Sequence, residues 1–166
     1  MRTETTTATR ANALWHCGAW LVLAVLMLTA CRPERMAYSK AVALPDEGWE
    51  RTMPITFAPQ YGDSTARYDI DLAVRHTPAY EFGTLTLVVD IVDEQAHTSR
   101  KRLELPLADS QGNWLGAGFG TLYQHRITLA RDVDPRQVRS IVVWQATTDS
   151  TALRNVSELS IFAKPQ

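Results

Sequence analysis

Apolar and polar residues alternate with a period of two along most of the chain from Trp49 onward. The clearest case runs from Tyr68 to Val74, where Tyr, Ile, Leu and Val alternate with Asp, Asp and Ala. Alternation of this kind puts successive side chains on opposite faces of an extended backbone, so it predicts half-buried strands. The other segments with this pattern are 49–57, 85–91, 103–107, 122–129, 141–145 and 159–163.

These segments predict about seven short strands, separated by turn signals such as Tyr61-Gly62-Asp63 and Asp134-Pro135. No segment carries the apolar stripe of a long helix, and residues 134–139 suit a single helical turn. Many short alternating strands without helices are typical of an all-β domain. We expect an antiparallel two-sheet β-sandwich of jelly-roll-like form, with a lipocalin-like barrel as the alternative.

The N-terminal segment has a different pattern. Arg2 and Arg10 precede an apolar run from Ala19 to Leu28, and Thr29-Ala30-Cys31 follows it. A basic start, a short apolar run and small residues before a cysteine indicate a bacterial lipoprotein signal. The run is shorter than the ~20 apolar residues that a membrane-spanning helix needs. We predict cleavage before Cys31 and acylation of that cysteine, with an uncleaved N-terminal anchor as the alternative.

Acylation of Cys31 would divide the chain into a signal peptide (1–30), a lipidated tether and lead-in (31–48) and a β-sandwich domain (49–166). Two acyl chains anchor a protein stably, because each buried methylene contributes about 0.8 kcal/mol. Arg32 follows the cysteine in place of the Asp that retains some lipoproteins at the inner membrane, which favours the outer membrane. The mixed charge of residues 32–35 favours the face towards the periplasm.

Composition narrows the function classes. Removing residues 1–30 from the 166-residue chain leaves 136 residues, the size of one domain, and takes the formal net charge from −1 to −2. No basic patch stands out, which argues against a nucleic-acid partner. Cys17 would leave with the signal and Cys31 would be acylated. We therefore expect neither a disulfide nor a thiolate nucleophile in the exported domain.

No catalytic or metal-binding motif is visible. His76, His97 and His125 lie on separate segments without ligand spacing, and no serine lies in a G-x-S-x-G motif. Asp69 and Asp71 are two residues apart, but the alternation places them on the solvated face of their strand. We expect no catalytic residues, no metal and no cofactor, and thus a protein that is not an enzyme.

Two segments are candidates for binding. Residues 109–120 hold four glycines around Trp114, which predicts turns with positive φ followed by a glycine-lined strand. The functional interpretation is a loop at one end of the sandwich, where Trp114 contacts a partner or ligand. In residues 75–82 the charged Arg75 lies at the end of a predicted strand, and the aromatic residues Tyr80 and Phe82 follow it. The candidate partner contacts are Trp114, Tyr80 and Arg75.

Several of these features occur together in a fixed order. They are Cys31, Leu44-Pro45 with Trp49 after it, Tyr68-Asp69-Ile70, Val74-Arg75-His76 with Tyr80, Leu107-Ala108-Asp109 and residues 112–118. Their order and spacing over nearly the whole mature chain resemble the gliding-motility lipoprotein family GldH. The C-terminal part departs from the family pattern, because Ala146-Thr147-Thr148 follow Gln145 where the family has a Met-Arg pair.

The resemblance implies a non-enzymatic lipoprotein, required for gliding in motile relatives and associated with envelope machinery that moves and secretes surface adhesins. It implies a membrane attachment through lipid and envelope protein partners. Relatives also occur in bacteria that do not glide, so the resemblance supports an envelope role more strongly than motility itself.

Two other functions stay open at this point. The first is a glycan- or small-ligand-binding lipoprotein in which Trp49, Trp114 or Tyr80 forms a stacking platform; exposed coplanar rings would favour it, and buried rings would argue against it. The second is a hydrolase with a dispersed site, which a cleft with converging Asp, His and Ser groups would favour.

The lipoprotein signal makes a direct prediction. The mass of the protein extracted from its membrane should equal that of residues 31–166 plus fatty acyl groups, because the peptidase removes the segment before Cys31. Intact-protein mass spectrometry measures this. A protein that keeps residues 1–30 and has no acyl groups would contradict the interpretation.

Overall fold

The computed structural model describes residues 36–148 and 150–166, so the signal peptide and Cys31 lie outside the described residues. In the described part the chain forms strands and one short 3-10 helix. They are β1 (Tyr38–Ala43), β2 (Trp49–Glu50), β3 (Ile55–Phe57), β4 (Tyr68–His76), β5 (Thr84–Val92), β6 (Thr98–Pro106), β7 (Ala117–Phe119), β8 (Leu122–Val133), η1 (Pro135–Gln137), β9 (Ser140–Gln145), β10 (Ala152–Leu153) and β11 (Val156–Pro165).

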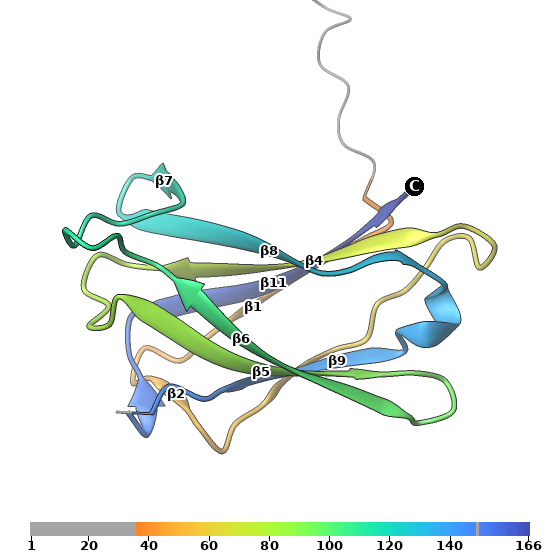
Figure 1. The fold of residues 1–166 in the computed structure, drawn as a ribbon, viewed down its shortest axis with the longest axis horizontal. Coiled ribbons are helices and arrows are strands. Elements are labelled where there is room, and N and C mark those ends of the chain that lie inside the picture. Colours follow the sequence, from red (N-terminus) through yellow and green to blue (C-terminus); the bar gives the residue numbers. More distant parts are fainter. Residues whose placement is uncertain (1–35, 149) are drawn as a thin grey trace, which may run out of the picture. The chain divides into compact units, whose positions relative to one another are not determined.

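The strands form two antiparallel layers, which Figure 1 shows one above the other. One sheet has the order β1-β11-β4-β8-β7 and the other has the order β3-β9-β5-β6. Strands β2 and β10 form a separate small pair. The expectation of an all-β antiparallel sandwich is confirmed. The two sheets stay separate, each with its own edge strands, and do not close as the lipocalin-like alternative requires.

The inner faces of the two sheets share one apolar core. In β4 the buried residues alternate as the sequence predicts, and Leu72 lies between Ile161 of β11 and Ile127 of β8. Burial of apolar surface contributes roughly 25 cal/mol per Å², so this core is the main source of stability. Its largest fully buried side chains are Trp49, Tyr68, Phe57, Ile70, Leu72, Leu85, Leu87, Leu107, Ile141, Leu153, Leu159 and Ile161.

All seven segments with alternating residues contain strand. Strands β8 and β11 extend beyond the predicted segments, and two other segments differ more from the prediction. Segment 49–57 is split into β2 and β3 by a turn in which Met53 N donates to Glu50 O at 3.1 Å. Strand β6 begins at Thr98, five residues before the predicted segment. Residues 98–102 are all exposed, so no buried face leaves an alternating pattern there.

The segment predicted as a lead-in contributes an edge strand. Strand β1 pairs with β11 along its whole length, from Tyr38 opposite Ala163 to Ala43 opposite Glu158. Four of its six residues are exposed, so the strand depends on backbone pairing and has little apolar signature. The sandwich therefore begins no later than Tyr38, ahead of the predicted boundary at Trp49. No helix in the described part is long and apolar enough to cross a membrane.

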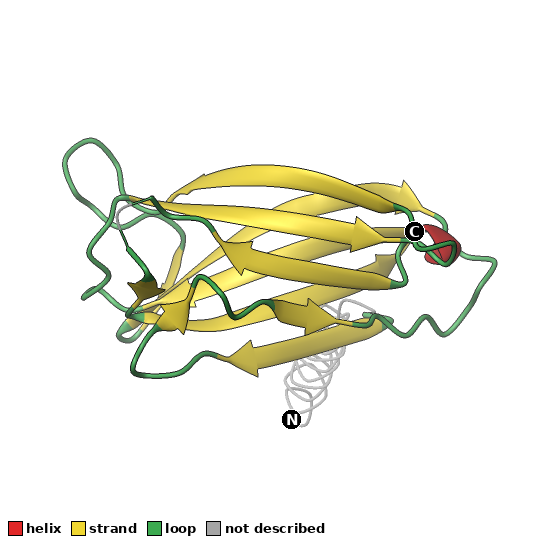
Figure 2. Cartoon of the chain, turned by 90° about the horizontal axis from the view of Figure 1, so that it is seen from below, coloured by secondary structure: helices red, strands yellow, loops and turns green. Residues whose placement is uncertain are grey.

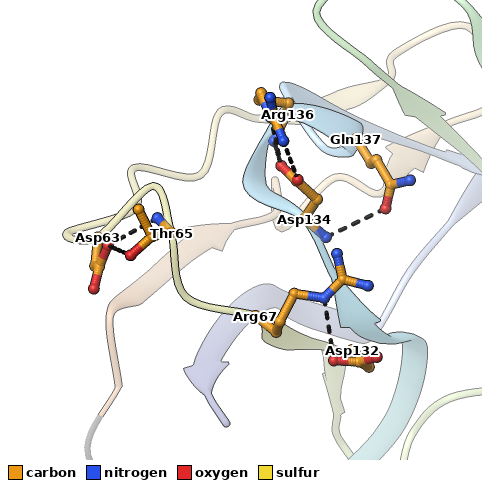
Figure 3. Close-up of polar contacts among 7 residues, drawn as sticks. All are labelled: Asp63, Thr65, Arg67, Asp132, Asp134, Arg136 and Gln137. Carbon is orange, nitrogen blue, oxygen red and sulfur yellow. Dashed lines mark hydrogen bonds and ion pairs between the residues drawn. The ribbon is translucent and has the colours of Figure 1, made fainter.

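The strands run lengthwise between two ends of the domain, and Figure 2 shows the loops gathered there. The single helical turn expected over 134–139 is η1, at the end opposite β7 (Figure 1). The side chain of Asp134 accepts from Arg136 N at 2.9 Å and forms an ion pair with the Arg136 guanidinium, while Gln137 Oε1 accepts from Asp134 N at 3.2 Å (Figure 3).

Further contacts hold the neighbouring chain segments at the same end. Arg67 Nε lies 3.2 Å from Asp132 Oδ1, and Asp63 accepts from the backbone and hydroxyl of Thr65 (Figure 3). The hydrogen bonds from the Arg136 side chain hold the pKa of the Asp134 carboxyl well below its usual range. These charges stay paired at neutral pH, so this end of the domain has a structural role in fixing its loops.

The fold makes a prediction about Trp49, whose side chain is fully buried and whose Nε1 donates to Met53 O at 2.6 Å. Replacement by alanine should lower the free energy of unfolding by about 3–5 kcal/mol, because it opens a cavity in the core. Thr56 on β3 is exposed, so Thr56→Ala is the control and should change stability by about 0.5 kcal/mol or less. Urea denaturation measures both. Equal effects of the two substitutions would contradict the placement of Trp49.

Candidate functional site

Five rings gather at the end of the sandwich where β4 ends and β8 begins. The ring of His76 lies at the centre, with centroid distances of 4.7 Å to Trp114, 5.3 Å to His125, 5.6 Å to Tyr123 and 5.8 Å to Tyr80. We call these five residues the His76 cluster. The register of β4 and β8 builds it, because His76 pairs with Tyr123 and the preceding inward residue of β4, Val74, pairs with His125.

Two imidazoles are in direct contact in this cluster. His76 Nε2 lies 3.3 Å from His125 Nε2, and His76 Nδ1 lies 2.9 Å from Thr77 O. The carbonyl can only accept, so the hydrogen-bond network assigns the proton of His76 to Nδ1 and makes Nε2 an acceptor for His125. Burial lowers the pKa of both imidazoles, and for His125 the neighbouring His76 lowers it further. Both rings are therefore neutral at pH 7.

The glycine-rich loop, residues 109–120, carries Trp114 to the cluster. Gly112, Gly116 and Gly120 have φ of +83°, +89° and +61°, as the sequence predicts for this segment. A Cβ at Gly116 would lie 2.6 Å from Gln124 O and 3.0 Å from the His125 ring. Glycine at position 116 therefore lets the loop approach β8 closely, and β7 follows as the glycine-lined strand.

The structure brings Trp114 and Tyr80 together but leaves Arg75 on the other face of β4. Trp114 is half-buried, whereas Tyr80 is only 4% exposed and lies between His76 and Phe82. The Arg75 side chain faces outward, where Nε donates to Gln124 Oε1 at 2.8 Å and a terminal nitrogen lies 3.1 Å from Glu158 Oε1. The role of all three as partner contacts stays a prediction, and the geometry favours Arg75 and Trp114 over the buried Tyr80.

Two features at this end escaped the sequence reasoning. Leu115 is 39% exposed. Among the side chains that the structure describes, no other large apolar one is exposed. A cavity of about 440 Å³ on the outer face is lined by Arg75, Ala117, Gly118, Leu122 and Gln124. The exposure of Leu115 could have been predicted from its position in a loop without alternating residues, because no strand there would carry the side chain into the core. No local signal foretells the cavity, because it joins strands whose pairing is not visible in the sequence.

The arrangement limits what the cluster can do chemically. Among the described residues, no three His, Cys, Asp or Glu side chains lie close enough together to hold a metal ion. Trp49 is fully buried and Tyr80 nearly so, and their rings offer no surface on which a sugar could stack. The stacking platform considered from the sequence therefore does not form at these two positions. Trp114, Tyr123 and His125 are the half-buried members of the cluster, and the loop beside them exposes Leu115.

These observations define the class of protein. It is an antiparallel β-sandwich whose candidate site is a loop supported by a cluster of rings at one end of two sheets. Comparison with known families then shows that the chain belongs to the GldH lipoprotein family, whose pattern matches residues 36–161. The resemblance found in the sequence is thereby confirmed.

Curated relatives agree with this membership. The chain is 26% identical over 140 residues to the "Gliding motility lipoprotein GldH" of Flavobacterium johnsoniae, covering 84% of this chain and 86% of that protein. It is 22% identical to the "Gliding motility lipoprotein GldH homolog" of Christiangramia forsetii, covering 83% and 85%. A solved infectious bursal disease virus VP2 subviral particle aligns at a TM-score of 0.35 with 14% identity, covering 81% of this chain and 34% of that one.

The histidine pair predicts how stability depends on pH. In the unfolded chain both imidazoles have the ordinary pKa of 6.5, and in the folded chain it is lower. The unfolded state therefore takes up protons first as the pH falls below 6.5, and stability declines from there towards the folded-state pKa. The midpoint temperature of thermal unfolding should therefore decrease as the pH is lowered from 7 to 5.5. Aspartates contribute only at lower pH, because their ordinary pKa is 3.8.

Substitution of His125 by glutamine should make this decline shallower, because it removes one of the two shifted groups. His97→Gln is the matched control, since the His97 side chain is 81% exposed and lies outside the cluster. Thermal unfolding of both variants and of the wild type at several pH values measures the effect. If the melting temperature of the His125 variant depended on pH as steeply as that of the wild type, His125 would not be one of the groups with a lowered pKa.

Proposed function

We propose that this protein is a lipid-anchored, non-enzymatic accessory or scaffold component of an envelope machinery for gliding or secretion. The observation that carries the proposal is membership of the GldH lipoprotein family over residues 36–161. Two relatives that are named gliding-motility lipoproteins align with more than four fifths of the chain. The ring cluster and its loop supply a surface suited to contact with another protein.

The anchor in this proposal is Cys31, acylated after removal of residues 1–30. The proposed location is the outer membrane, with the domain in the periplasm. The tether is then short, because only residues 32–37 separate Cys31 from the start of β1 at Tyr38. This length supports an attachment that keeps the domain close to the lipid surface.

The start of β1 and the His76 cluster lie at opposite ends of the domain. Tyr38 pairs with Ala163, which in turn pairs with Ile70 near the start of β4. The His76 cluster lies at the other end of β4, nine residues long, which corresponds to roughly 27 Å of strand. The glycine-rich loop thus lies at the end of the domain away from Tyr38, where β1 begins (Figure 1), and a partner in the periplasm can reach it there.

The proposed partner surface consists of Leu115, Trp114 and Arg75. Aromatic residues and arginine are enriched in protein interfaces, which supports Trp114 and Arg75 as contact residues. Leu115 exposes apolar surface next to Trp114, so a partner that covers the loop would bury it. Arg75 lies beside the outer cavity at the same end of the sheet.

Co-purification from native envelopes tests the proposal. The wild-type protein, extracted with mild detergent, should bring along a defined protein partner. Leu115→Ser should reduce recovery of that partner several-fold while leaving the amount and melting temperature of the protein unchanged, because the side chain lies at the surface.

Arg139→Ser is the control, since Arg139 is exposed beside η1 at the opposite end of the domain. It should recover the partner as the wild type does. A protein that is always isolated alone would argue strongly against a scaffold role, and equal recovery by both variants would remove Leu115 from the interface.

A further inference from the structure

A second cavity, of about 530 Å³, lies on the outer face of the four-stranded sheet. Its volume is in the range of small-molecule sites. The residues that carry the argument are Arg51, Val88, Arg100, Arg102, Trp144 and Ala146. None of them belongs to the His76 cluster or to the proposed partner surface.

The floor of this cavity is apolar and flat. Val88 in β5 pairs with Arg102 of β6 on one side and with Trp144 of β9 on the other, so these three side chains form a row across the outer face. Trp144 is half-buried and its Nε1 is buried. Because Nε1 is the only polar atom of the side chain, what Trp144 exposes to the cavity is ring carbon.

The walls of the cavity are cationic. Arg51 reaches over from the β2–β3 turn, where its terminal nitrogen donates to the carbonyl oxygens of Thr147, Thr148 and Ser150. Carbonyl oxygens position the guanidinium but do not cancel its charge. Among the described residues no ion pair joins Arg51 to a carboxylate, and the carbonyl contacts hold its side chain in place.

The two arginines of β6 differ in their pairing. Arg100 forms two hydrogen bonds of 2.6 Å with Asp90, and they lower the pKa of that carboxyl, so the pair stays charged and fixed. Arg102 lies 3.7 Å from Glu104, and both side chains are more than half exposed. Such a contact is weak, which leaves Arg102 able to bind another anion. Three arginines and no carboxylate of the described residues line the cavity.

We infer that this cavity is a binding site for a sugar acid. The carboxylate of the ligand binds between Arg51 and Arg102. Arg102 offers a planar pair of N–H donors of the kind that carboxylates prefer, and Arg51 adds a positive charge that its carbonyl contacts hold in place. The carbon-rich face of the sugar ring packs on Trp144 and Val88. The site is independent of the proposed scaffold role, so either can hold without the other.

An acidic peptide suits the cavity less well. An extended peptide gains most of its affinity on a sheet by pairing with free backbone groups. At Val88, in the middle of the cavity floor, strand β5 is already paired with β6 on one side and with β9 on the other, so its backbone groups are engaged. The free backbone groups of β6 lie on the side away from β5. Recognition here depends on side chains and on the ring floor, which favours a compact ring bearing a carboxylate.

Calorimetry with the acylated protein in detergent micelles tests this inference. The probes are trigalacturonic acid, its methyl ester, which has the same shape without charge, and an N-acetylated triglutamate peptide. We expect the acid to bind, and the ester and the peptide to bind at least tenfold more weakly. Added salt should lower the affinity for the acid, because the contact is between charges.

Variants locate the site. Arg102→Gln should weaken binding of the acid about tenfold, because it removes a charge-assisted pair of hydrogen bonds. Arg139→Gln removes the same charge outside the cavity and should bind as the wild type does. Trp144→Phe should abolish the change in tryptophan fluorescence that the acid causes.

Melting temperatures close to that of the wild type would show that the variants are folded. The inference is overturned if the methyl ester or the peptide binds as tightly as the acid, if Arg102→Gln binds it as the wild type does, or if no probe binds at millimolar concentration.

Discussion

The mutual burial of the inner faces of β4 and β5 is the constraint on which the structure depends. Each strand lies inside its sheet, β4 between β11 and β8 and β5 between β9 and β6. Their inward side chains are therefore held laterally by backbone pairing and covered by the opposite sheet. This frame fixes the positions of the strand ends, and the ring cluster follows from it, because His76 and His125 meet only in the observed register of β4 with β8.

The central strands could be predicted from the sequence because burial of one face leaves a period of two. Tyr68–Val74 shows this pattern in full and is strand throughout. Strand β1 and the first half of β6 left no such signal, since their residues are mostly exposed and backbone pairing alone defines them. The two-residue strands β2 and β10 are too short to show any period.

The candidate sites were predictable to a smaller extent. Glycines with positive φ and a ring-bearing loop could be recognised locally, and Trp114 was found in this way. The contact between His76 and His125 could not, because 49 residues separate them and only the strand register joins them. The same holds for the cavity over Trp144, whose arginines come from β6 and from the turn after β2. The alternating pattern predicts that Trp144 lies in a strand, but it does not predict which residues lie beside it in the folded chain.

Strand β6 ends its sheet and leaves one row of backbone groups without a neighbouring strand in the described residues. Arg100, Lys101 and Arg102 follow one another along this open edge. Edges of this kind invite a second copy to continue the sheet, and a run of like charges opposes such growth by repulsion. Lipid-anchored proteins are concentrated in two dimensions and collide often. Arg100 is already paired with Asp90, and the charges of Lys101 and Arg102 would keep neighbouring copies from aggregating side by side.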